Sequence, residues 1–153
     1  MALIYILSKF LHIVGAILWI GGVVAVSILN ARLVREREPA LLAAMARQSA
    51  FFGKSVAGPA AGVTLIAGIV MVAIGRIGFP FWIIWGLLAM FISGAIGSNV
   101  LQRAAEELGR RMEAAEPDDA VITSLQRRLN RFSTINILLL ISAVWAMVFR
   151  PTL

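Results

Sequence analysis

The chain has 153 residues, of which 60% are hydrophobic and 14% charged, and its formal net charge is +6. A soluble domain carries roughly 25% charged residues, so the composition argues against an ordinary soluble fold. The absence of cysteine excludes disulfides, thiolate metal sites, iron–sulfur clusters and thiol catalysis within this chain. The positive charge does not indicate nucleic-acid binding, because the basic residues lie between apolar segments and form no basic face with interleaved aromatic residues.

Four segments contain no Asp, Glu, Lys or Arg: residues 10–31, 55–75, 77–102 and 132–149. About 20 apolar helical residues cross the ~30 Å hydrocarbon core of a bilayer. The first segment also lacks the basic start and the cleavage site of a signal peptide, so we expect it to be retained. The sequence therefore predicts an all-α fold, a four-transmembrane-helix bundle that forms one integral membrane domain over residues 1–153. Its spans are expected at approximately 4–31, 53–75, 80–102 and 132–150.

Basic residues are distributed unevenly between the two sides of this predicted bundle. The connections 32–54 and 103–131 hold 11 of the 14 basic residues, and only Lys9, Arg76 and Arg150 lie on the opposite side. By the positive-inside rule, the two longer loops are expected to face the cytoplasm and both termini to lie outside. The expected location is the bacterial inner (cytoplasmic) membrane, with multiple passes.

Both long connections are expected to be partly helical. Pro39 precedes a run of good helix formers and is expected to start a helix. Glu106 and Glu107 precede Arg110 and Arg111 by four residues, the spacing of helical ion pairs. Asp118 or Asp119 is expected to cap the helix that leads into the fourth span.

Small residues recur at four-residue spacing in the spans. Gly58 and Gly62 form a GxxxG motif, and Ala89, Ser93 and Gly97 repeat the pattern on the third span. Such residues allow helices to approach closely in lipid. Packing within one bundle, dimerisation and room for a flat ligand are alternative explanations. We expect a homo-oligomer, most simply a dimer packed through Gly58 and Gly62.

His12 is the only histidine, and it lies in the first span. An ionisable residue inside a span is a functional-site hypothesis by default. Small residues and one tryptophan share its helix face and predict a flat recess, as a porphyrin beside its axial ligand would need: Gly15, Ala16, Trp19 and Gly22. Neutral imidazole is a common haem ligand. The alternative is a histidine near the interface that is hydrogen-bonded to a neighbouring helix or to water.

The segment from Lys9 to Gly22 resembles the first span of the HemJ-type protoporphyrinogen oxidases and their four-helix relatives. These relatives include copper-resistance-D-like proteins and a family of uncharacterised predicted integral membrane proteins. In the HemJ pattern a Lys stands three residues before the His, a Trp seven after it and a Gly ten after it; Lys9, Trp19 and Gly22 fit. The likeness extends loosely over the other spans. It implies a four-helix bundle with haem b on His12.

Several positions differ from the HemJ pattern. An Arg sixteen residues after the His is Ile28 here, and the W-x-H-x-K segment reads Trp82-Ile-Ile-Trp-Gly86. In the N-E-x-P-T segment, Arg131 and Ser133 replace Glu and Pro. These differences argue against protoporphyrinogen oxidation, and the chain is most similar to the uncharacterised predicted integral membrane proteins.

Further haem contacts are expected from Met90 and from three basic residues. Met90 has a depth in the membrane similar to that of His12 and is a candidate second axial ligand; five-coordinate iron or a ligand from another protomer are alternatives. Lys9, Arg76 and Arg150 suit the haem propionates, or else anchor the bundle by snorkelling to the headgroups.

The expected function is that of a b-type haem-binding protein, with electron transfer or redox chemistry on oxygen, a quinone or a porphyrin. No general acid, base or nucleophile is visible within the spans, so no catalytic residue is assigned. The alternative is a non-catalytic membrane scaffold, or an accessory or transport subunit without a cofactor.

Overall fold

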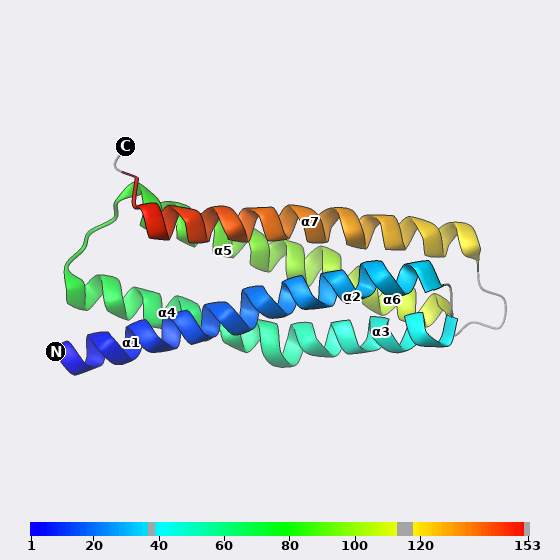
Figure 1. The fold of residues 1–153 in the computed structure, drawn as a ribbon, viewed down its shortest axis with the longest axis horizontal. Coiled ribbons are helices and arrows are strands. Elements are labelled where there is room, and N and C mark those ends of the chain that lie inside the picture. The colour runs from blue at the N-terminus through cyan, green and yellow to red at the C-terminus, as the bar shows by residue number, and fades with distance from the viewer. Residues whose placement is uncertain (37–38, 113–117, 152–153) are drawn as a thin grey trace.

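The computed structural model describes residues 1–36, 39–112 and 118–151, and all regular secondary structure in these ranges is helical. The helices form four long rods that run side by side (Figure 1). Each of the first three rods is interrupted by a π-helical turn, denoted η. In chain order the rods are α1 (Ala2–Ala16), η1 (Ile17–Gly21) and α2 (Gly22–Glu36); α3 (Pro39–Phe52), η2 (Gly53–Ala57) and α4 (Gly58–Gly75); α5 (Phe81–Ile96), η3 (Gly97–Leu101) and α6 (Gln102–Met112); and α7 (Asp119–Phe149).

All four rods are long and apolar enough to cross a membrane. Large apolar side chains cover their outer surfaces, including Leu3 at 77% exposure, Phe91 at 67% and Val148 at 70%. Helices that are apolar on their outward faces are stable in lipid rather than in water. The predicted all-helical fold with four membrane-crossing helices is therefore confirmed.

The two long connections are mostly helical extensions of the spans. Pro39 begins α3, and Asp118 caps α7 by accepting hydrogen bonds from the backbone N–H groups of Ala120 and Val121 at 2.9 and 3.2 Å. Both predictions are confirmed. Beyond these helices, each connection also includes a short segment, 37–38 and 113–117, outside the described residues.

A tight connection joins α4 to α5 at the end of the bundle that also holds both termini (Figure 1). α4 ends where Arg76 adopts a left-handed conformation with φ 48°, and Gly78 follows with φ 74°. Glycine populates positive φ without a steric penalty, which suits Gly78 to this turn. Pro80 then stands at the N-cap of α5. This connection lies between the second and third expected spans, 53–75 and 80–102.

The rods pack as two pairs at this end of the bundle. α1 packs against α4, and α5 packs against α7, whereas α4 and α5 have few contacts with each other. Small residues allow both close approaches, because a Cβ on Gly15 would meet Thr64 and a Cβ on Gly86 would meet the methyl group of Met147. At the opposite end the pairs are joined through α2, α3, α6 and the first part of α7. Near the middle, Trp19 and Leu140 belong to one buried apolar cluster that connects the pairs.

Candidate functional site

His12 lies in α1 and faces α4. Its Nδ1 is 2.8 Å from the backbone carbonyl oxygen of Thr64. Because a carbonyl can only accept, Nδ1 carries the proton and donates it, and in the neutral ring this tautomer leaves Nε2 with a free lone pair. Nε2 makes no hydrogen bond to any residue that the structure describes. The half-buried ring lies against Gly68, where a Cβ would be 3.1 Å from Nδ1.

The recess expected beside His12 is closed at two of its glycines. A Cβ on Gly15 would lie 2.5 Å from Oγ1 of Thr64 and 3.0 Å from the carbonyl oxygen of Ala60, so α4 occupies this space. The ring of Phe52 covers Gly22 in the same way. The expectation of a flat recess is therefore wrong at Gly15 and Gly22, because neighbouring helices of the same chain fill the space there. Ala16 is half-buried, and the assignment of these residues to haem binding stays a prediction.

Trp19 and Met90 meet at the centre of the bundle. Trp19 is 7% exposed and packs with Ala57, Ala60 and Leu140, and Met90 packs against the same cluster. Gly68, which contacts His12, is eight residues from the end of its helix at Arg76, and Met90 is nine residues from Phe81. At 1.5 Å per residue these depths are about 12 and 14 Å. His12 and Met90 therefore lie at similar distances from the helix ends near the termini, and their depth in the membrane stays a prediction; His12 does not line the cavity that Met90 and Trp19 share.

The three basic residues outside the long connections lie in the half of the bundle that holds both termini (Figure 1). Lys9, Arg76 and Arg150 are all exposed. The Arg150 guanidinium lies 5.4 Å from the ring centroid of Trp82, a cation–π contact that holds it at the end of α7. Among the described residues no group of three or more His, Asp or Glu side chains could hold a metal ion. A metal at His12 would therefore have at most one further ligand of these types from the described part of the chain.

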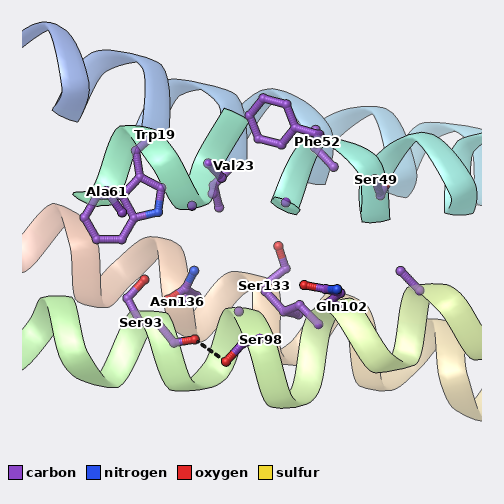
Figure 2. A pocket seen from close by; sticks show the side chains of 18 of the residues that line it. Trp19, Val23, Ser49, Phe52, Ala61, Ser93, Ser98, Gln102, Ser133 and Asn136 are labelled. Atoms are coloured by element: carbon purple, nitrogen blue, oxygen red, sulfur yellow. Dashed lines mark hydrogen bonds between the residues drawn. The ribbon is translucent and has the colours of Figure 1, made fainter. Parts of the chain in front are cut away.

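A cavity of about 640 Å³ lies between the four rods, on the side of Trp19 that faces away from the chain termini (Figure 2). Most of its lining is apolar, and it includes residues of all three π-helical turns. Ser93 and Asn136 line it and are each 2% exposed. Oγ of Ser93 and Oδ1 of Asn136 have no hydrogen-bond partner among the described residues. Nearby, the hydroxyl groups of Ser27 and Ser133 hydrogen-bond to each other.

Sequence reasoning missed this cavity. It placed Ser93 in a pattern of small residues, for which packing within the bundle, dimerisation and room for a flat ligand were alternatives. In the structure the Asn136 side-chain oxygen is unpaired, and Ser93 contributes an unpaired hydroxyl group. The signal in the sequence was the presence of an amide and a hydroxyl inside charge-free spans, where buried polar groups are costly unless they are paired.

Lys54 lines the cavity and forms an ion pair with Glu106. Nζ of Lys54 is 3.1 Å from Oε1 of Glu106, which also accepts a hydrogen bond of 3.0 Å from Gln102. The Gln102 hydrogen bond and then Lys54 hold the pKa of Glu106, beyond the apolar part of the helix, below its ordinary value. The predicted ion pair of Glu107 with Arg111 is confirmed at 2.7 Å. Glu106 differs from expectation, because the ion pair that it forms among the described residues is with Lys54 of the adjacent rod and not with Arg110.

The fold and the apolar outer surface define an integral membrane protein with four spanning helices and an internal cavity. Comparison with known families gives a more particular assignment. Residues 6–151 match the family described as predicted integral membrane protein (DUF2269), and the chain belongs to this family. No curated protein and no solved structure matches the chain.

Proposed function

We propose that this protein binds haem b in the bacterial inner membrane, with Nε2 of His12 as the axial ligand. One observation carries the proposal: Nδ1 of His12 donates to the carbonyl oxygen of Thr64. Metal-ligating histidines almost always donate their other ring N–H to a carboxylate, a backbone carbonyl or water, which fixes the tautomer and the ring orientation. His12 has this arrangement before any metal is considered.

The chain's own residues would orient and screen the group. The Thr64 carbonyl and Gly68 hold the imidazole ring, and Trp19, two turns further along the same rod, belongs to a buried apolar cluster. Met90 is a candidate second ligand, and Lys9, Arg76 and Arg150 are candidate partners for the propionates. When bound, haem supplies one-electron redox chemistry, which suits electron transfer or oxidation of a small or lipid-soluble substrate such as oxygen, a quinone or a porphyrin. The relationship to the HemJ-type and copper-resistance-D-like proteins is part of this proposal.

The second candidate function is a scaffold or accessory subunit without a cofactor. The packing at two glycines favours this function, because Thr64 and Phe52 of the same chain occupy the space beside Gly15 and Gly22. On this hypothesis the bond from His12 to Thr64 only joins two helices, as polar side chains commonly do in membranes. The two candidates predict different spectra.

The test is the absorbance spectrum of detergent-purified protein from haem-replete cells, oxidised and reduced. We expect a Soret band in the wild type and its loss in His12→Ala, because the described residues offer no second histidine or cysteine as a replacement. Asn136→Leu is the matched control within the spans and should keep the band. Circular dichroism checks that each variant is helical.

Two outcomes oppose the proposal. An unshifted Soret band in His12→Ala places the ligand on another residue. A colourless wild-type protein from haem-replete cells removes haem and leaves the scaffold function.

A further inference from the structure

A groove of about 410 Å³ lies between α6 and the first part of α7, at the end of the bundle far from the termini (Figure 1). Three arginines and two glutamates line it: Arg103, Arg110, Arg128, Glu106 and Glu107. We call it the arginine groove. It is separate from the cavity between the four rods, because the two share no lining residue.

The two glutamates of the arginine groove already have cationic partners. Oε1 of Glu106 is 3.1 Å from Nζ of Lys54, which belongs to the second rod. The carboxylate of Glu107 forms ion pairs with Arg110 at 2.5 Å and with Arg111 at 2.7 Å. Each carboxylate is therefore compensated, and Arg110 is the one arginine of the lining that compensates a carboxylate of the groove.

The other two arginines of the groove have no such partner. Arg103 and Arg128 form no hydrogen bond or ion pair with any residue that the structure describes, and both are exposed. Arg103 directly follows the charge-free segment 77–102, and Arg128 precedes the segment 132–149 by four residues, about 6 Å of helix. Because these segments cross the hydrocarbon core, both arginines lie at the depth of the lipid headgroups.

The chemistry of the groove favours a phosphate that carries apolar chains. The guanidinium group binds phosphate oxygens through two parallel N–H donors, and basic pockets between membrane helices bind lipid headgroups. Val100, inside a charge-free segment, and Leu125 also line the groove, so its wall is partly apolar. Towards the bundle centre the surface of α7 remains apolar, with Ile135 and Leu138 exposed. A soluble phosphate ester would make no use of these apolar surfaces.

We infer that the arginine groove binds the phosphodiester of an anionic phospholipid such as phosphatidylglycerol. Arg103 and Arg128 hold the phosphate oxygens, and the acyl chains lie along the apolar outer surface of the spans. A zwitterionic lipid fits less well, because its ammonium group would bring a further cation to two arginines that no carboxylate compensates. The site uses no residue of the haem proposal and does not depend on which side of the membrane is cytoplasmic.

The test is native mass spectrometry of the full chain in detergent, which counts the lipids bound to each protein molecule. Phosphatidylglycerol is compared with phosphatidylcholine of the same acyl chains, since both contain the phosphodiester and only the second contains an ammonium group. We expect one tightly bound phosphatidylglycerol per chain, with an affinity at least about tenfold higher than that of phosphatidylcholine.

Two double variants remove the same charge at different places. Arg103→Gln with Arg128→Gln removes both uncompensated arginines of the groove, and its affinity for phosphatidylglycerol should fall at least about tenfold. Arg127→Gln with Arg131→Gln is the matched control, because these exposed arginines lie on α7 but do not line the groove. The control should retain the affinity of the wild type within about threefold. Circular dichroism checks that both are helical; if the first does not fold, Arg128→Gln and Arg127→Gln give the same comparison.

A third measurement separates a lipid from a soluble phosphate ester. Glycerophosphoglycerol is the headgroup of phosphatidylglycerol without its acyl chains, and an equal concentration of it should leave the lipid bound. Displacement at that concentration would overturn the inference in favour of a soluble ligand.

Two other results would also overturn it. Equal affinity for the two lipids would show that the groove does not recognise an anionic headgroup. An equal loss in the two double variants would show that any arginine at this depth attracts the lipid. None of these results involves the Soret band, so failure here is distinguishable from failure of the haem proposal.

Discussion

The close approach of α1 and α4 makes Gly15→Ala a sharp test of the packing around His12. The added Cβ would lie 2.5 Å from Oγ1 of Thr64 and 3.0 Å from the carbonyl oxygen of Ala60. Ordinary contacts begin at 3.4 Å, so the shortfalls are 3.4 − 2.5 = 0.9 Å and 3.4 − 3.0 = 0.4 Å. The hydroxyl can rotate away only by losing its 2.8 Å hydrogen bond to Ala60, and the backbone oxygen can move only with its helix.

The expected cost is about 1–3 kcal/mol of the free energy of unfolding, the usual range for overpacking a close contact. Gly21→Ala is the matched control on the same rod, because nothing lies within 4 Å of its Cβ. That variant should be neutral or more stable, since alanine is favoured over glycine in helices by about 1 kcal/mol. The double variant Gly15→Ala with Thr64→Ala should recover part of the loss, because the nearer of the two obstructing atoms is gone.

The assay is equilibrium unfolding of the purified protein in mixed micelles, followed by circular dichroism. Equal stability of Gly15→Ala and Gly21→Ala would refute the argument, since it would mean that α1 and α4 are not in close contact at Gly15. A double variant as unstable as Gly15→Ala would assign the whole cost to the Ala60 carbonyl.

Two further predictions concern the membrane and the assembly. With the arginine-rich connections in the cytoplasm, a reporter fused after Leu153 should behave as periplasmic and one inserted at Pro117 as cytoplasmic; the opposite result would reverse the proposed orientation. If the protein is a homodimer packed through Gly58 and Gly62, Gly62→Leu should shift its mass in mild detergent towards that of the monomer, and an unchanged mass would place Gly62 inside the bundle.

The helices could be predicted from the sequence because lipid imposes simple constraints. A charge-free segment of about 20 residues has few alternatives to a spanning helix, and Pro39 and Asp118 carry local signals that need no tertiary contacts. The turn at Gly78 was predictable for the same reason. The π-helical turns were not, because no local pattern at residues 17–21, 53–57 or 97–101 distinguishes them from continuous α-helix.

The partners of individual side chains depended on how the helices pair. His12 could be identified as unusual from its residue type alone, but its bond to Thr64 depends on α1 packing against α4. The contact between the Phe52 ring and Gly22 likewise depends on which helix lies beside Gly22. The cavity was missed because its two unpaired atoms come from different rods, and each of Ser93 and Asn136 alone reads as an ordinary packing residue.

The pairing of the rods near the termini also has a consequence for biosynthesis. α1 with α4 and α5 with α7 are consecutive hairpins along the chain, and each buries its own small residues. The first hairpin therefore leaves the ribosome before the second. Each hairpin has its own close packing near the termini, so we expect the joining of their other halves, which closes the cavity between them, to be a later step of assembly.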